Sequence, residues 1–378
     1  MAYIQTGLST VDKLQILSKA SQYDLACSCG TTKQEHRTRS QDNQWIYPVT
    51  LFNGARTFLL KTLMANTCVN NCLYCPLRVG NDVRRCALSP EAIGSLFLDY
   101  YRKRMVSGLF LSSGVDRDPD TTMERLITSA RYVRTRGFRG YTHLKIIPGA
   151  SDGAISEALS LAHSVSLNME VPGKRHFDQV CKGKDYDMQI IRPLKLLHEL
   201  TAKGGRFAGK HVTTQFVAGA SDETDQELVT YTHGLYQRLG LNRVYFSAYQ
   251  RGVGHGSMPG EHSINSNSDM LTREHRLYQT DFLLRKYGFS AQEIPFGANG
   301  HLSLETDPKE LWAQRHPEFF PININKATKL QLLRVPGLGP RTVNTILAVR
   351  RNGGRVSSLG LLGRRNKRFA KAEQYLSF

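Results

Sequence analysis

The sequence has 378 residues but no apolar run of about 18 residues, so no segment is expected to span a membrane. Its first residues, MAYIQTGLSTVDKLQILSKA, lack the basic start and apolar core of a secretory signal peptide. Hydrophobic residues make up 40% and charged residues 22%, which is ordinary for a globular chain. We therefore expect a soluble, cytoplasmic protein.

Acidic residues are few relative to basic ones, because 32 Asp and Glu stand against 50 Lys and Arg, giving a formal charge of +18. The excess is concentrated in residues 321–378, which hold 12 Lys or Arg and one acid, Glu373, for a net charge of +11. A local cationic field of this kind favours polyanions, nucleic acid first. On charge alone, a basic tail that only aids solubility is the alternative.

Cysteine is scarce as well, with seven in the chain. The odd number and the tight central group argue against a disulfide framework. The central group reads Cys68-Val-Asn-Asn-Cys72-Leu-Tyr-Cys75, a C-x3-C-x2-C spacing that chance would produce about 0.002 times in such a chain. The remaining cysteines are scattered, which argues against a second cluster; they are Cys27, Cys29, Cys86 and Cys181.

The gaps of three and two residues let one short loop direct several thiolates at a single metal centre. Structural zinc sites use four protein ligands, and no fourth Cys or His follows at a finger-like spacing. Three thiolates on a four-iron cluster would instead leave one iron open for chemistry. A zinc loop completed by Cys86 or a histidine is the alternative.

Strand-like and helix-like segments alternate from about residue 56 onward. Strands are predicted at 58–65, 108–112, 141–147, 165–171, 211–218 and 243–249, with helices from 89 and at 121–136, 151–162, 187–203 and 223–239. This alternation predicts an α/β fold whose parallel sheet curls into a partial barrel. Active sites in such barrels lie at the C-terminal ends of the strands, and the cysteines follow the first strand directly.

The domain organisation follows from these patterns. We expect an N-terminal helix (9–20) and an irregular arm (26–48) in residues 1–50, a partial barrel in 51–295, a connector in 296–320 and a basic module in 321–378. Residues 250–268, rich in Gly, Ser and Asn, are expected to form a loop over the mouth of the site.

The cysteine pattern, with the aromatic Tyr74 before the third cysteine, resembles the signature of the radical S-adenosylmethionine superfamily. The resemblance implies a partial (β/α)6 barrel in which Cys68, Cys72 and Cys75 hold a [4Fe–4S] cluster. It also implies that S-adenosylmethionine chelates the free iron and that one electron cleaves it reductively to a 5′-deoxyadenosyl radical, which takes hydrogen from the substrate. A one-electron reductant such as flavodoxin or ferredoxin is then the expected partner.

Other positions match the superfamily less closely. Where it usually has a Gly-Gly-Glu-like turn near the cofactor's amino group, this chain has Ser112-Ser113-Gly114, which leaves no acidic partner there. The resemblance further implies cofactor contacts from Asn168 and Glu170 on the fourth strand and from Gly219 after the fifth. For Glu170, a surface or purely structural role is an equal alternative. No catalytic residue is identified.

The C-terminal stretch NKATKLQLLRVPGLGPRTVNTILAVRR predicts two helices around the turn Pro336–Gly339. Exposed N–H groups at the start of the second helix form a ready phosphate site. The stretch resembles a helix–hairpin–helix motif, an all-α DNA-binding element, although Val343 stands where that motif usually has Ala. Its expected nucleic-acid contacts are Gly337, Leu338, Gly339, Arg341, Arg350 and Arg351. The alternative is a helical hairpin used for protein packing.

Together, the two modules resemble the radical S-adenosylmethionine family of DNA modification or repair proteins, over about residues 10–350. We expect radical chemistry on nucleic acid, with DNA favoured over RNA. The alternatives are modification of tRNA or rRNA, a non-enzymatic iron–sulfur DNA-binding protein, and a small-molecule enzyme whose basic tail docks a partner.

Overall fold

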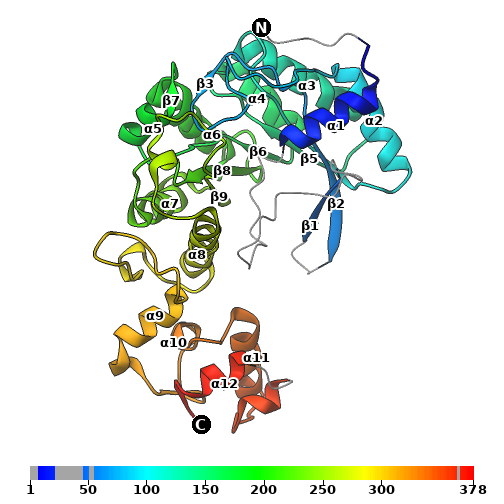
Figure 1. Ribbon diagram of the computed structural model, residues 1–378. Coiled ribbons are helices and arrows are strands. Elements are labelled where there is room, and N and C mark those ends of the chain that lie inside the picture. Colours follow the sequence, from blue (N-terminus) through cyan, green and yellow to red (C-terminus); the bar gives the residue numbers. More distant parts are fainter. Residues whose placement is uncertain (1–6, 22–45, 51–54, 364–366) are drawn as a thin grey trace. The chain divides into compact units, whose positions relative to one another are not determined.

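The computed structural model describes residues 7–21, 46–50, 55–363 and 367–378 (Figure 1). The chain divides into two compact units, one of Met1–Glu223 with Gly234–Leu271 (the barrel unit) and one of Thr224–His233 with Thr272–Phe378 (the C-terminal unit). Across the described ranges, no helix is both long enough and apolar enough to cross a membrane.

The barrel unit is built on a seven-stranded sheet in the order β1-β2-β4-β5-β6-β8-β9. Its strands are β1 (Ile46–Thr50), β2 (Arg56–Leu63), β4 (Gly108–Ser112), β5 (Tyr141–Lys145), β6 (Ser164–Ser166), β8 (His211–Ala218) and β9 (Arg243–Ala248). The last six are parallel and follow chain order, and β1 pairs antiparallel with β2 at the edge. This topology confirms the predicted partial (β/α)6 barrel.

Helices connect the parallel strands and pack on one another in sequence order, α2 on α3, α3 on α4 and α4 on α6. The helices of this unit are α1 (Thr10–Ala20), α2 (Pro90–Arg102), α3 (Pro119–Thr135), α4 (Asp152–Leu161), α5 (Lys174–Val180) and α6 (Arg192–Thr201), the last preceded by a π-helical turn (Asp187–Ile191). The side chain of Ser89 caps α2 and Pro90 occupies its first turn, as the sequence predicts. Helices α7 (Asp225–Leu239) and α8 (Asn267–Lys286) have segments in both units.

Side chains alternate between the two faces of the sheet. Leu60, Leu109 and Leu144 are fully buried, whereas the intervening positions on the same strands include Lys61 and His143. A strand places successive residues on opposite faces, so the apolar set and the polar set face opposite sides of the sheet. The inner face of the sheet therefore includes polar side chains.

Three local features differ from the prediction. Residues 46–48 were expected in the irregular arm, yet they belong to β1; the rest of that arm, 26–45, lies outside the described residues. Pro48 is tolerated in β1 because the strand is at the sheet edge. The fourth parallel strand, β6, ends at Ser166, so Asn168 and Glu170 lie beyond it. A short helix and strand, α5 and β7 (Cys181–Lys182), fall where no element was predicted, and β7 pairs with β3 (Asn71–Cys72).

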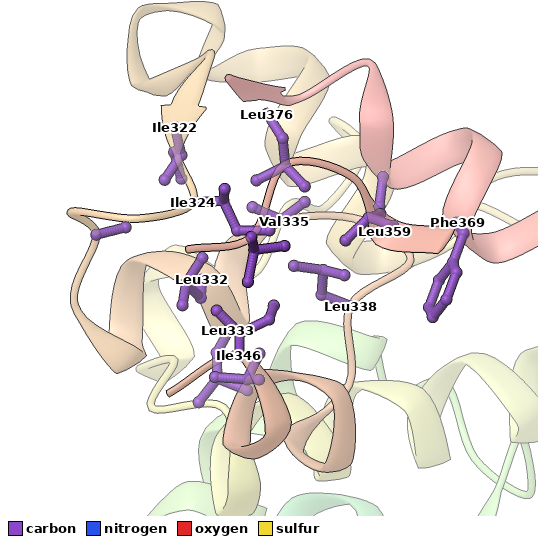
Figure 2. Close-up of a cluster of buried hydrophobic side chains, with 14 residues drawn as sticks. Ile322, Ile324, Leu332, Leu333, Val335, Leu338, Ile346, Leu359, Phe369 and Leu376 are labelled. Carbon is purple, nitrogen blue, oxygen red and sulfur yellow. The ribbon is translucent and has the colours of Figure 1, made fainter. Parts of the chain in front are cut away.

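The C-terminal unit encloses its own apolar core (Figure 2). Its further elements are α9 (Pro308–Arg315), α10 (Lys329–Arg334), α11 (Pro340–Arg351), α12 (Lys367–Glu373), β10 (Ile322–Asn323) and β11 (Leu376–Ser377). Leu332, Val335 and Ile346 are completely buried and join α10 to α11 around the turn. The β10–β11 pair means that the module is not purely helical.

Candidate active site

The cysteine loop opens on a cavity of about 150 Å³ at the C-terminal ends of the parallel strands, named here the cysteine cavity. Nine of the residues predicted from the sequence line it: Cys68, Cys72, Tyr74, Cys75, Ser112, Ser113, Gly114, Asn168 and Glu170. They come from the cysteine loop, the end of β4 and the segment after β6. The fold thus brings together side chains that are up to about a hundred residues apart in the chain.

Gly114 allows the end of β4 to approach the cysteine loop closely. A Cβ at this position would lie 2.3 Å from the carbonyl oxygen of Thr67, and the amide of Gly114 donates to the carbonyl of Ala65 at 2.7 Å. Any larger residue would displace the loop backbone directly before Cys68. The glycine is therefore required by packing, independently of any ligand.

Arg85 holds the backbone of the cysteine loop in place. This arginine is buried, and its guanidinium donates to the carbonyls of Leu77, Arg78 and Asn81 at 2.8–3.1 Å and also to that of Asn66. These carbonyls flank the three cysteines on both sides in the sequence. One charged side chain thus fixes both ends of the loop.

Two of the three sulfurs accept backbone hydrogen bonds. The amide of Val115 donates to Sγ of Cys68, and the amide of Leu77 donates to Sγ of Cys75, each at 3.4 Å. Burial, followed by the charge of Cys72, raises the pKa of Cys75 to about 12. Metal binding would have to deprotonate this thiol, so affinity for a metal centre should rise with pH.

Cys72 is surrounded by polar groups from β7 and the turn after it. Cys72 and Cys181 are direct partners in the β3–β7 pair, and a hydrogen bond from Cys181 lowers the pKa of Cys72, with Lys184 adding to the shift. Burial opposes the charge of Lys184, but the neighbouring Cys72, Cys181 and Glu170 raise its pKa on balance. The ammonium group of Lys184 therefore lies beside the thiolate of Cys72.

Glu170 has an unusual backbone for a residue with a side chain, with φ of 67°. Its amide donates to the carbonyl of Gln215 at 3.0 Å, which ties the segment after β6 to β8. Burial raises the pKa of its carboxyl group, against the charges of Lys145 and Lys184. A left-handed backbone and a buried acid in one cavity are typical of functional sites, which argues against the surface alternative.

Gly219 is not among the residues that line the cysteine cavity. It has φ of 89°, as expected for the turn after β8, and its amide donates to the carboxylate of Glu223. The same carboxylate accepts from the backbone and hydroxyl of Ser221. Glu223 precedes α7 and accepts hydrogen bonds from the turn. Gly219 and Glu223 therefore both stabilise the conformation of this turn.

The loop after β9 packs on the cysteine loop. The amide of His255 donates to the carbonyl of Leu73 at 2.8 Å, and the amides of Gly252 and Gly254 donate to the carboxylate of Glu261. Met258, within this loop, is completely buried. The segment predicted to cover the site therefore contacts the backbone between Cys72 and Cys75.

Within the described part of the chain, no group of three His, Cys, Asp or Glu side chains converges on a single metal ion. A four-iron cluster takes each thiolate on a different iron, so this finding concerns single-ion sites. The donor set fits the cluster, because three cysteines lie on one loop, two of them with N–H···S bonds and the third beside a cation.

The predicted nucleic-acid residues separate into two places in the C-terminal unit. Gly337, Leu338 and Gly339 line a depression of about 490 Å³. Arg350 and Arg351 line another of about 750 Å³, at the other end of α11. A helix of 12 residues is about 18 Å long, so the two groups are not one contact surface.

The depression at the start of α11 has mixed charge. Gly337, with φ of 86°, packs against α12, and Leu338 belongs to the core rather than the surface. Basic and acidic residues both line this depression: Lys309, Lys367, Arg368 and Lys371 with Asp307 and Glu310. Arg341 is exposed on the first turn of α11, and no side chain of the described residues caps this helix.

The depression at the end of α11 carries four cations, Lys329, Arg350, Arg351 and Arg355, and its lining includes no carboxylate from the described residues. Arg350 donates to the carbonyl of Ala327 at 2.6 Å, so part of its role is structural. The exposed side chains of Lys329, Arg351 and Arg355 are the ones that present charge to solvent. This surface is called the basic depression below.

Sequence reasoning missed Arg85, Lys145 and Lys184. Lys145 had a usable signal, because YTHLK alternates Tyr141, His143 and Lys145 with apolar or small residues, as a strand with a polar inner face does. Arg85 and Lys184 lie in irregular segments without periodicity. Only the three-dimensional structure brings them to the cysteines.

The sequence matches no protein-family model and no curated protein. Among solved structures, the fold is similar to the [FeFe]-hydrogenase maturase HydG from Carboxydothermus hydrogenoformans, with 14% identity, a TM-score of 0.44, and coverage of 59% of this chain and 50% of that one. Another HydG structure has 15% identity and a TM-score of 0.44, and the match covers 72% of this chain and 62% of that one. OxsB, a cobalamin-dependent S-adenosylmethionine radical enzyme, has 11% identity and a TM-score of 0.36, and the match covers 81% of this chain and 51% of that one. This chain therefore spans half to about three fifths of the length of these proteins.

Proposed function

We propose that this protein is a radical S-adenosylmethionine enzyme that acts on nucleic acid, with DNA modification or repair as the favoured role. One observation carries the proposal. The C-x3-C-x2-C loop lies at the C-terminal ends of a partial barrel and shares one cavity with Ser112–Gly114, Asn168 and Glu170. Catalysis in barrels of parallel strands takes place at this end.

In this proposal, Cys68, Cys72 and Cys75 hold a [4Fe–4S] cluster, and S-adenosylmethionine occupies the cysteine cavity. When bound, the two supply a 5′-deoxyadenosyl radical after one-electron reduction, which takes hydrogen from the substrate. A small protein reductant such as flavodoxin or ferredoxin would provide the electron, and we propose a cytoplasmic location for the protein.

The chain's own residues position and protect this chemistry. Arg85 fixes both ends of the cysteine loop, and the loop after β9 covers the backbone at Leu73. Lys145 and Lys184 give the cavity positive charge that suits the carboxylate of an amino-acid ligand, and Glu170 gives it an acid that suits an ammonium group. Ser112 and Ser113 offer hydroxyl groups where the superfamily usually has an acid.

The nucleic-acid part of the proposal is supported by the C-terminal unit. Residues 321–378 carry a net charge of +11, from 12 Lys or Arg and one acid. The sequence around the turn between α10 and α11 resembles a helix–hairpin–helix motif, and the basic depression adds three exposed cations. Contacts of this type bind phosphates without reading sequence, so they suit a module that retains a strand near an enzyme.

The test is 5′-deoxyadenosine formation by anaerobically reconstituted protein with reductant and S-adenosylmethionine, measured with DNA, with RNA of equal length and with neither. We expect product in all three and more of it with DNA. Greater stimulation by RNA would favour modification of tRNA or rRNA. DNA binding by iron-loaded protein that forms no product would indicate a non-enzymatic iron–sulfur protein.

A further inference from the structure

Cys72 faces a cysteine that the proposed cluster does not use. Strands β3 and β7 pair antiparallel, and their register sets Cys72 directly opposite Cys181. Both side chains are buried, with exposed fractions of 6% and 2%. Cys72 belongs to the cysteine loop, whereas Cys181 comes much later in the chain, directly after α5. The fold therefore places a proposed cluster ligand beside a second free thiol.

The backbone hydrogen bonds show which kind of strand pair this is. The amide of Leu73 donates to the carbonyl of the last residue of α5 at 2.8 Å. The carbonyl of Cys72 accepts from the amide of Cys75, and the amide of Cys181 donates to a carbonyl within α5. Cys72 and Cys181 are therefore a non-hydrogen-bonded pair, in which the Cα atoms are about 4.5 Å apart and the side chains lie close together. Disulfides join Cα atoms roughly 4.4–6.8 Å apart, so this pair can form one without a large movement of the backbone.

The thiol groups of Cys72 and Cys181 are joined by a hydrogen bond. The other described cysteines have different partners, since Sγ of Cys68 and Sγ of Cys75 accept backbone amides and Sγ of Cys86 is 3.8 Å from a backbone carbonyl. Cys72 lines the cysteine cavity, whereas Cys181 is not among its lining residues. A small oxidant that enters this cavity therefore reaches Cys72 first, with Cys181 as the neighbouring thiol.

We infer that Cys181 is a resolving cysteine, which forms a reversible disulfide with Cys72 when no cluster is bound and so protects this ligand from irreversible oxidation. The inference adds a form of regulation to the proposed site, and it rests on the proposed function only in taking Cys72 as a cluster ligand. Disulfides in reducing compartments are usually transient and respond to oxidants, which suits such a device.

The oxidant is hydrogen peroxide, which has two non-hydrogen atoms and fits a cavity of about 150 Å³. Peroxide oxidises the Cys72 thiol to a sulfenic acid and releases one water. The Cys181 sulfur then attacks the sulfenic sulfur, the S–S bond forms, and the hydroxyl group leaves with the thiol proton as a second water. The two thiols thus lose two electrons and two protons to the peroxide, and an added dithiol restores both. Without Cys181, a second peroxide converts the sulfenic acid to a sulfinic acid, which a dithiol does not reduce.

The test treats full-length, cluster-free protein with hydrogen peroxide, blocks the remaining thiols with iodoacetamide and identifies linked peptides by mass spectrometry. We expect Cys72–Cys181 as the main disulfide. Iron uptake in anaerobic reconstitution should then fall at least about threefold, because one of the three cluster thiolates is lost, and dithiothreitol should restore it. A different main pair, such as Cys72–Cys75, or iron uptake that the mapped disulfide leaves unchanged, would overturn the inference. Reduced wild-type protein that takes up no iron would instead contradict the proposed function, and the peptide map would still decide whether this disulfide forms.

The variant Cys181→Ser should take up iron normally before oxidation. After peroxide, dithiothreitol should restore less than about half of its iron uptake, and the mass spectrum should show sulfinic acid on Cys72. Cys86→Ser is the matched control, because Cys86 is also buried but contacts a different part of the chain, and it should recover like the wild type. If Cys181→Ser lowers the melting temperature, Cys181→Ala replaces it with the same expected loss. Full recovery in the Cys181 variant that retains the wild-type melting temperature would show that Cys181 does not protect Cys72.

Discussion

At the residue scale, Arg85 has the most specific structural task near the cysteines. Its guanidinium satisfies four backbone carbonyls around the loop, and all of them would lose a charged donor in Arg85→Met. We expect the free energy of unfolding to fall by at least about 3 kcal/mol, because hydrogen bonds to charged groups contribute about 1.5–3 kcal/mol each and four of them are lost. Urea denaturation measures this.

The same variant should retain less iron per chain after anaerobic reconstitution, because the loop that carries the cysteines loses its support. Arg102→Met, at an exposed position on α2, is the control and should leave both values unchanged. Wild-type stability and iron content in Arg85→Met would show that the loop is held by other contacts.

Variants of individual cysteines distinguish the cluster ligands from a cysteine that only lies near them. Cys72→Ala should abolish the cluster absorbance and iron content while leaving affinity for DNA intact, because the basic C-terminal residues are unchanged. Cys181→Ser should retain the iron, since Cys181 contacts Cys72 but is not among the three loop ligands. If Cys181→Ser lost as much iron as Cys72→Ala, Cys181 would be a fourth ligand of the cluster. No iron would then be left open for S-adenosylmethionine.

At the element scale, the turn between α10 and α11 depends on Gly337. A Cβ there would lie 2.2 Å from the carbonyl oxygen of Arg368 on α12, and φ is already 86°. Gly337→Ala should destabilise the C-terminal unit by at least about 2 kcal/mol, through strain and overlap together. Gly353→Ala is the control, since φ is 75° but nothing lies near its Cβ, and it should cost about 1 kcal/mol. Equal losses in urea denaturation would contradict this packing.

Burial lowers the pKa of Lys309 to about 7, although its ammonium group donates to the carbonyl of Leu338 at 2.6 Å. The unfolded chain keeps this lysine protonated up to about pH 10.4, so between pH 7 and 10 it binds more protons than the folded protein. Folding stability should therefore rise with pH across this window. Lys309→Met should remove that part of the rise in pH-dependent urea denaturation; an unchanged slope would show that Lys309 stays charged.

The basic depression on α11 should contribute to nucleic-acid binding through phosphates alone. The triple variant Lys329→Gln, Arg351→Gln, Arg355→Gln should reduce the slope of log K against log salt by up to about 3 for duplex DNA, roughly one for each phosphate contact. Fluorescence anisotropy at several salt concentrations measures the slope. A triple variant at exposed barrel positions, Arg102→Gln, Lys195→Gln and Lys203→Gln, is the control. Equal slopes in the two triple variants would place the nucleic-acid surface elsewhere.

At the scale of the whole molecule, the order of the parallel strands was predictable because their apolar periodicity is strong. Ser89 with Pro90 marked the start of α2, and β4 and β8 occur at the predicted residues. Asn168 and Glu170 were predicted at the site for the wrong local reason, since both lie after β6 rather than on it. The left-handed backbone of Glu170 has no signature in the sequence, because it depends on pairing with β8.

The remaining site residues could not be predicted, because contacts between segments distant in the chain bring them to the site. Lys184 follows β7, which exists only because Cys181 pairs with Cys72. The predicted nucleic-acid residues separate for a related reason: Leu338 is buried in the core, and Arg350 donates to the carbonyl of Ala327. Competition from local packing of this kind is not visible in a motif.

The central claim is that three cysteines of one loop hold a four-iron cluster with one iron open to S-adenosylmethionine. The most direct measurement is 5′-deoxyadenosine formed by anaerobically reconstituted wild-type protein with reductant and S-adenosylmethionine, alongside iron and zinc analysis of the same sample. The account predicts about four irons per chain, little zinc, and product that disappears in Cys72→Ala. Zinc in place of iron, or iron-loaded wild-type protein that forms no 5′-deoxyadenosine, would contradict it.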